Sequence, residues 1–116
     1  MLNDPLQRLA AARTQGNWVE AAEICEKELG DIDQAMTCWK QVIEAEPNRL
    51  DAHDALQKLC SMRGDWTTLA SVLQHRAKIV PRDQLKGVLL DLVKVYREQL
   101  GDETTAAKIE SRLGEL

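Results

Sequence analysis

Apolar residues recur every three or four positions along almost the whole chain, which is the spacing of one buried face of an α-helix. The pattern predicts an all-α fold of about seven helices, over residues 5–14, 18–29, 32–45, 49–62, 66–79, 82–100 and 103–113. The sixth helix has the widest apolar face, extended by Leu90 and Val95, which indicates that it is covered on two sides. Gly87 lies within this helix, either to allow a close helix crossing or as a tolerated residue.

The expected breaks between helices share a short motif. Gly-Asp occurs at residues 30–31, 64–65 and 101–102, where the glycine ends one helix and the aspartate caps the next. Side chains that can accept a hydrogen bond from the first helical turn predict further N-caps at Asp4, Asn17 and Asn48. The turn residues therefore agree with the apolar pattern about where the helices begin and end.

The motif repeats with a fixed period. Pro47 and Pro81 are 34 residues apart, and so are the first two Gly-Asp motifs. A second echo relates residues 24–31 to residues 95–102 at an offset of 71, because the third unit has three extra residues. A period in this range is typical of solenoids built from helix–turn–helix units. The insert, and one extra residue before the first Gly-Asp motif, are expected to alter the superhelical pitch locally.

Within this period the residues resemble the tetratricopeptide repeat. That family has W-x2-L-G-x2-Y in the first helix of a unit, and A-x3-F followed by proline in the second. The first unit matches at Trp18, Ala21, Ala22, Cys25, Ala35, Trp39 and Pro47, with several replacements by similar residues. The later units are more degenerate and match at Leu56, Cys60, Leu69, Leu73, Pro81, Leu89, Leu92, Tyr96 and Ala106.

The resemblance implies a solenoid of antiparallel helical hairpins with a right-handed superhelix. It predicts a single domain over residues 1–116, with units at 17–47, 48–81 and 82–116 and a flanking helix at 4–15. One hairpin is too small to bury its own apolar stripe, so stacked hairpins share a core and leave a concave groove. Three aromatic residues are interpreted as core residues, with an anchor in the groove as the alternative: Trp18, Trp39 and Trp66.

By this resemblance the groove is lined mainly by the first helix of each unit. Its candidate partner-binding residues are Glu23, Glu26, Asp51, Asp54, Lys58, Lys94 and Arg97. Their mixed charge, acidic toward the N-terminal end, suits an extended or helical segment of another protein with Lys or Arg at one end. The Lys/Asn clamp with which some tetratricopeptide domains hold a C-terminal carboxylate is not matched. A cluster of four acids is either a solvated face or a docking surface for a basic segment: Glu20, Glu23, Glu26 and Glu28.

Composition narrows the partners and the chemistry. The net charge of −4 argues against nucleic-acid binding, and no apolar stretch approaches the roughly 20 residues of a membrane span. The first residues lack a signal-peptide pattern, so a cytoplasmic protein is expected. His53 and His75 have no catalytic companions, and no enzymatic activity or cofactor is expected. Three cysteines without zinc-site spacing are expected to be buried free thiols: Cys25, Cys38 and Cys60.

Two functions follow from these observations. The preferred one is an adaptor that binds a peptide or helix of another protein in its groove. The alternative is a structural module that self-associates, as a homodimer, or forms part of a longer array. The array is expected to end at residues 113–116 without a clearly polar capping helix, and exposure of Ile109 and Leu113 would invite end-to-end contacts. RNA binding by a helical-repeat surface is disfavoured by the acidic charge.

Overall fold

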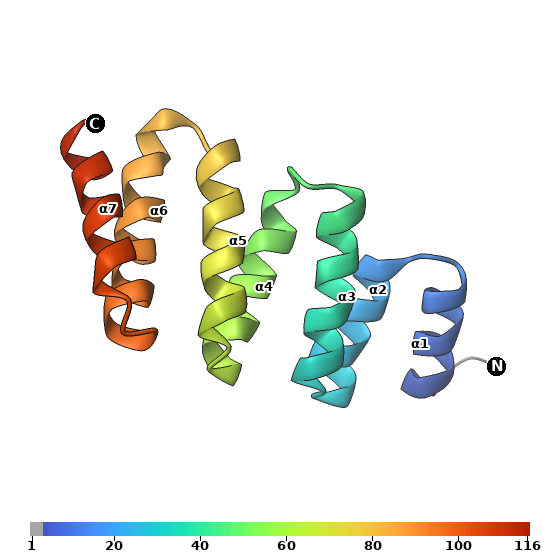
Figure 1. Ribbon diagram of the computed structural model, residues 1–116. Helices are drawn as coiled ribbons and strands as arrows, with labels where there is room; N and C mark the ends of the chain where they lie inside the picture. The colour runs from blue at the N-terminus through green and yellow to red at the C-terminus, as the bar shows by residue number, and fades with distance from the viewer. Residues whose placement is uncertain (1–3) are drawn as a thin grey trace. The chain divides into compact units, whose positions relative to one another are not determined.

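The computed structural model describes residues 4–116 and shows an all-α chain, with seven helices and no strand in this range (Figure 1). The helices are α1 Pro5–Thr14, α2 Trp18–Glu23, α3 Ile32–Ala45, α4 Leu50–Arg63, α5 Trp66–Ile79, α6 Arg82–Lys94 and α7 Glu103–Gly114. Two π-helical segments, η1 Ile24–Leu29 and η2 Val95–Gln99, continue α2 and α6. The seven predicted helices are confirmed, with boundaries that differ from the prediction by at most one residue.

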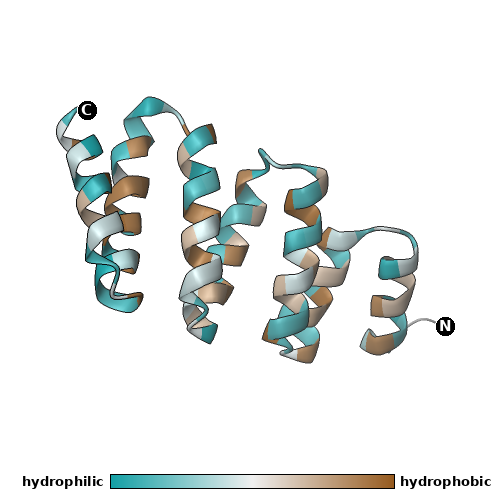
Figure 2. Ribbon diagram, viewed as in Figure 1, coloured by the Kyte–Doolittle hydropathy of each residue, from teal (hydrophilic) through white to brown (hydrophobic). Residues whose placement is uncertain are grey.

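The chain forms two compact units whose boundary falls inside α4, between Leu59 and Cys60. In the first unit, over residues 4–59, α2 packs against both α1 and α3. In the second unit, over residues 60–116, α6 and η2 both pack against α5 and α7. The helices carry apolar and polar positions side by side (Figure 2), so each unit can bury apolar stripes and keep polar residues outside.

The core of the first unit includes small residues on adjacent helices. On α2, η1 and α3, four of them have no exposed surface: Ala21, Ala22, Cys25 and Ala35. Short side chains at such positions allow the axes of α2 and α3 to approach closely. Trp39 is only 5% exposed, which confirms the prediction that it is a core residue, whereas Trp18 is half-buried.

The core of the second unit is centred on α6 and η2. Buried residues on this helix are Val88, Leu89, Leu92, Val93 and Val95. Leu69 and Leu73 on α5 and Ala106 on α7 complete the core, and Trp66 is half-buried. Leu90 is 52% exposed, so the predicted cover on two sides includes Val95 but not Leu90. The side of α6 that carries Leu90 is not covered, because α5 and α7 contact only part of the circumference of α6.

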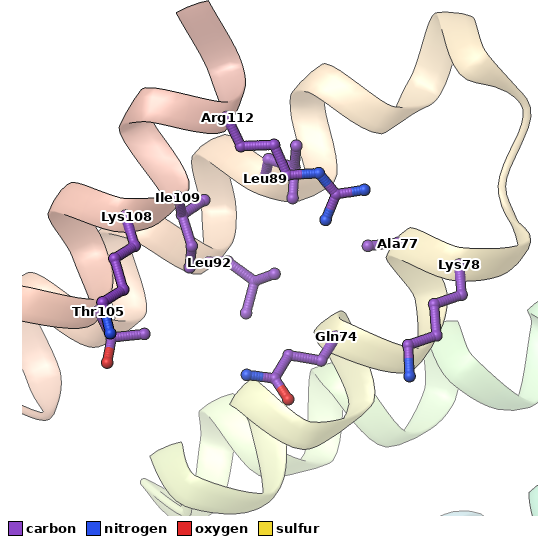
Figure 3. Close-up of a pocket in the computed structure, with 9 residues that line it drawn as sticks. All are labelled: Gln74, Ala77, Lys78, Leu89, Leu92, Thr105, Lys108, Ile109 and Arg112. Carbon is purple, nitrogen blue, oxygen red and sulfur yellow. The ribbon is translucent and has the colours of Figure 1, made fainter. Parts of the chain in front are cut away.

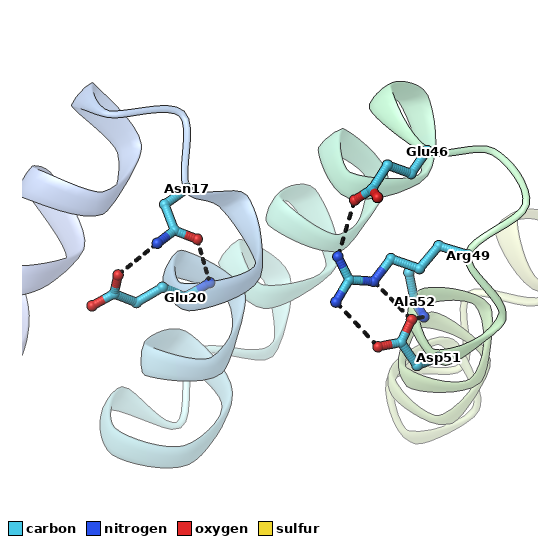
Figure 4. Close-up of polar contacts among 6 residues, drawn as sticks. All are labelled: Asn17, Glu20, Glu46, Arg49, Asp51 and Ala52. Carbon is cyan, nitrogen blue, oxygen red and sulfur yellow. Dashed lines mark hydrogen bonds and ion pairs between the residues drawn. The ribbon is translucent and has the colours of Figure 1, made fainter.

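The helix-ending motif occurs four times in the described residues, because Gly16-Asn17 joins the three predicted Gly-Asp turns. Each of these glycines has a positive φ, between 63° and 75°, which ends a helix in the left-handed conformation. The residue after it accepts a hydrogen bond from the third backbone N–H of the next helix, at Asn17, Asp31, Asp65 and Asp102. The side chain at that third position also bonds to the cap (Figure 4), at Glu20, Gln34, Thr68 and Thr105.

The echo between residues 24–31 and 95–102 corresponds to the two π-helical segments. In each, the N–H of the aspartate after the glycine donates to a carbonyl six residues earlier, at 2.9 Å for Asp31 and 2.8 Å for Asp102. The equivalent bond from Asp65 spans five residues, at 3.0 Å. Because a π-turn holds one more residue than an α-turn, the extra residue before the first Gly-Asp motif lies within the helix.

The start of α4 differs from the prediction by one residue. The helix begins at Leu50, so the residue before it is Arg49, and the predicted N-cap Asn48 lies one position too early. The guanidinium of Arg49 bridges the turn, with its Nη1 3.0 Å from Glu46 Oε2 and its Nε 2.8 Å from Asp51 Oδ1 (Figure 4). Ion pairs of the arginine therefore hold this turn in place of the expected side-chain cap.

The buried titratable residues include one histidine and three cysteines, and they belong to the packed interior. His53 is fully buried, and its Nε2 donates a hydrogen bond of 2.8 Å to the Pro47 carbonyl, which links α4 to the preceding turn. The prediction for the cysteines is confirmed, since Cys25, Cys38 and Cys60 are all buried and none takes part in a disulfide. Burial raises the pKa of Cys25 to about 11, so its thiol stays protonated at neutral pH.

Candidate binding site

Several predicted groove residues of the first unit, residues 4–59, already form ion pairs within the chain. Glu26 on η1 is only 17% exposed, and its Oε1 lies 3.8 Å from Lys58 Nζ. Asp51 is held by Arg49, which lowers the pKa of its carboxyl. Glu23 on α2 and Asp54 on α4 are exposed. Glu26 and Lys58 are thus brought together, and Asp51 is directed toward its own turn.

The two predicted groove residues of the second unit differ from each other. Lys94 is exposed at the end of α6, whereas Arg97 on η2 binds two carboxylates of α7. Its Nε is 2.6 Å from Glu103 Oε2, and its Nη1 is 3.1 Å from Glu110 Oε2. These hydrogen bonds lower the pKa of both glutamates. Arg97 therefore already has charge partners inside the unit.

A pocket of about 260 Å³ opens in the second unit, where α5 and α7 flank α6 (Figure 3). Leu89 and Leu92 of α6 form its floor and are almost fully buried. Ala77 of α5 and Ile109 of α7 line it from the two sides and are half-buried. The deepest part of the pocket is therefore apolar, with contributions from all three helices.

The rim of the pocket is polar and carries three positive charges. Lys78 comes from α5, and Lys108 and Arg112 come from α7; all three side chains belong to exposed residues. In Figure 3 Arg112 extends from α7 toward the α5 side of the pocket. None of these three cations has an ion pair within residues 4–116, although Lys108 contributes to the lowered pKa of Asp102, and no acidic residue lines the pocket.

The remaining polar lining residues are Gln74 on α5 and Thr105 on α7. Gln74 Nε2 donates to the Tyr96 hydroxyl on η2, and Thr105 Oγ1 donates to the capping carboxylate of Asp102 at 2.7 Å. Because these two side chains already have hydrogen-bond partners, the cations are the polar groups that remain available to a bound molecule. The pocket can hold an apolar group against its floor and anionic groups at its rim.

The sequence did not predict this pocket, because the candidate binding residues came from the first helix of each predicted repeat. The rim residues lie on α5 and α7, which are the second helices of the predicted repeats 48–81 and 82–116. A signal was present in the spacing, since Gln74 and Lys78 are one helical turn apart, as are Lys108 and Arg112. Which apolar residues lie beneath these pairs depends on how α6 packs against both helices.

The charge of the chain is distributed unevenly between its two halves. Residues 1–59 contain six basic and eleven acidic residues, for a net charge of −5, whereas residues 60–116 contain nine basic and eight acidic residues, for +1. The overall charge of −4 is therefore concentrated in the first half. The three-cation rim belongs to the half that is close to neutral.

Comparison with known proteins found no matching protein-family model and no matching curated protein. Within residues 4–116 there is no cluster of three or more His, Cys, Asp or Glu side chains that could hold a metal ion. No helix in the same range is both long and apolar enough to cross a membrane.

Proposed function

We propose that this chain is a non-catalytic interaction module that binds a segment of another protein. The observation that carries the proposal is the pocket between α5, α6 and α7, with its apolar floor and its three cations that lack ion pairs in residues 4–116. We also propose that the helices form tetratricopeptide-like hairpins. The recurring Gly-Asx turns and the 34-residue period support this architecture.

A protein segment suits the pocket because binding energy at protein interfaces is concentrated in a few side chains that fill small depressions. Leu89, Leu92 and Ile109 provide the apolar surface for such a side chain, and the cations above it provide orientation. Charged groups at the edge of a contact mainly increase specificity and association rate. The pocket therefore combines the two elements that a selective interface needs.

The groove predicted from the sequence is a second surface for the same function. Glu23 and Asp54 are exposed acidic residues of this groove, and Lys58 stands beside Glu26. A basic segment is the partner that this charge favours. The groove and the pocket thus predict partners of opposite charge, and variants of each surface can distinguish them.

Self-association is the alternative function, and it would bury apolar residues that are exposed in the single chain. Leu6, Met62 and Leu90 are all more than half exposed. Ile109 and Leu113, which the sequence analysis expected to be exposed, are half-buried. Apolar side chains that are exposed and close together mark association surfaces, whereas single ones are ordinary. A sedimentation experiment over a wide range of protein concentration measures this directly.

The test of the proposed function is an affinity pull-down from a lysate of the source cells, analysed by mass spectrometry. Three chains are compared: the wild type, the pocket variant Lys108→Glu/Arg112→Glu and the groove variant Asp54→Lys/Lys58→Glu. All four side chains that are changed belong to exposed positions, so the variants are expected to remain helical by circular dichroism.

We expect one protein to be retained by the wild type and lost from one of the two variants. Loss from the pocket variant alone assigns binding to the pocket, and loss from the groove variant alone assigns it to the groove. Recovery of the same proteins by all three chains would contradict the proposal. Recovery of only the chain itself, together with concentration-dependent sedimentation, would support self-association instead.

A further inference from the structure

The pocket between α5, α6 and α7 has a combination of features that specifies its partner more narrowly. We infer that it binds an acidic segment of another protein, in which one or two large apolar or aromatic side chains are flanked by carboxylates. This inference rests on the proposed function and assigns the chemistry of the partner. It differs from the groove hypothesis, which predicts a basic segment.

The floor of the pocket selects for an apolar anchor. Leu89 is 1% exposed and Leu92 is 2% exposed, so the atoms that they present at the bottom of the pocket are backed by the core. Ile109 and Ala77 add apolar walls, and Figure 3 shows the leucine and isoleucine side chains pointing into the space. A polar group placed here would lose its hydration without gaining a hydrogen bond from these residues.

The size of the pocket favours a side chain over a free small ligand. Sites that enclose a drug-sized molecule usually have volumes of about 300–1,000 Å³. This pocket, at about 260 Å³, lies just below that range and is open at the rim. It can accommodate one or two large side chains, while the rest of the bound segment lies across the surface of α5 and α7.

The rim selects for carboxylates around the anchor. Lys108 and Arg112 are separated by one helical turn on α7, about 6 Å along the helix axis, and Lys78 lines the pocket from α5. Acidic side chains on either side of the anchor can therefore approach cations on both walls. Arg112 can bind a carboxylate through two parallel N–H groups, whereas the lysines act as point charges.

The charge of the surroundings is consistent with an acidic partner. The half of the chain that contains the pocket has a net charge of +1, so it does not repel an acidic segment as the first half, at −5, would. Salt should weaken the interaction, because raising the ionic strength from about 0.1 M to about 1 M shortens the Debye length from about 10 Å to about 3 Å.

The test uses defined peptides and the full chain labelled with ¹⁵N and with ¹³C at isoleucine and leucine methyl groups. The probe is acetyl-Glu-Glu-Leu-Phe-Glu-Glu-amide, and its counterparts carry Gln or Lys in place of every Glu. We expect the Glu peptide to shift the signals of Ile109, Leu89 and Thr105. Binding of the Gln peptide should be at least about tenfold weaker, and the Lys peptide should produce no shift at these residues.

Three variants make the test specific. Lys108→Glu/Arg112→Glu should abolish the shifts, and Ala77→Phe, which fills the pocket without changing the charge, should also abolish them. Arg82→Glu/Lys86→Glu is the matched control, since it reverses one arginine and one lysine that are exposed on α6 outside the pocket. This control should bind within about threefold of the wild type. Circular dichroism and the dispersion of the methyl spectrum establish that each variant is folded.

Equal binding of the Glu and Gln peptides, or shifts confined to the first unit, would overturn the inference. So would no binding of the Glu peptide by a folded chain. If the peptides fail but the pull-down still recovers a protein through the pocket, the proposed function stands and only the acidic chemistry is wrong. If the labelled chain responds instead to its own concentration at the same residues, the occupant is a second copy.

Discussion

At the scale of the residue, two glycines of this chain have opposite structural roles. Gly30 has a φ of +63°, which a residue with a side chain adopts only with strain. Gly87 lies within α6 and has an ordinary helical φ, and no heavy atom lies within 4 Å of the position of an added Cβ. The sequence left open whether Gly87 allows a close helix crossing. The space around it shows that it does not.

Replacement of each glycine by alanine should therefore change stability in opposite directions. Gly87→Ala should raise the free energy of unfolding by up to about 1 kcal/mol, because alanine restricts the unfolded chain and fits the helix. Gly30→Ala should lower it by about 1–2 kcal/mol, because the left-handed conformation is strained. Urea denaturation followed by circular dichroism measures both changes. A destabilising Gly87→Ala would show that this position is more crowded than the structure indicates.

At the scale of the element, hydrogen bonds and ion pairs between polar side chains connect neighbouring helices. Arg97 links η2 to α7 through Glu103 and Glu110, and Gln74 links α5 to η2 through the Tyr96 hydroxyl. These contacts connect residues that are 6, 13 and 22 positions apart in the chain. Arg97, which the sequence analysis assigned to partner binding, is therefore held by two carboxylates of α7.

The Arg97 contacts should make stability depend on pH. Arg97 lowers the pKa of Glu103 and Glu110 below their usual value of 4.5, so the folded state favours their charged forms. This stabilisation is fully present above about pH 4.5 and is lost as the pH falls through the lowered pKa values. Arg97→Gln should therefore have a lower melting temperature than the wild type at pH 7, and the difference should shrink below pH 4.5.

Thermal melts at a series of pH values provide the measurement, and Arg82→Gln is the control. Arg82 is exposed and has no ion pair within residues 4–116, so its replacement should leave the melting temperature close to that of the wild type throughout. An Arg97→Gln deficit that stays constant down to pH 3 would mean that the arginine stabilises the unit by packing and not by its carboxylate partners.

At the scale of the whole molecule, the three thiols report on the stability of both units. Cys25 and Cys38 lie in the first unit and Cys60 lies in the second, and none is more than 1% exposed. Burial raises the pKa of Cys25 and of Cys38, which lowers the fraction of reactive thiolate. A thiol reagent can therefore reach them only when the surrounding helices open.

The thiols of the native chain should react at least about a thousandfold more slowly than those of the unfolded chain, since domain stabilities of about 5–15 kcal/mol allow only rare opening. The measurement is the rate of labelling by a chromogenic disulfide reagent, with and without urea. Mass spectrometry of the labelled peptides separates the three sites. Rapid labelling of Cys60 alone in native buffer would show that the second unit opens independently of the first.

The sequence by itself determined the helices and their ends. The three-to-four spacing of apolar residues defined seven helices, and the Gly-Asp motifs fixed three of the four tight turns, because these signals are local and depend on neighbouring residues only. It also indicated the burial of Trp39 and of the three cysteines, since they lie on apolar stripes. The start of α4 was placed one residue early because a side chain that can cap is not always used.

Only the tertiary structure decided which side chains meet. The pocket needs Ala77, Leu92 and Ile109 from three different helices, and no spacing within one helix contains that information. The same holds for Arg97, whose carboxylate partners are on α7, and for Leu90, which the packing of α6 leaves outside. A local pattern determines the face that a helix buries, whereas a binding site depends on the packing of several helices around a common space.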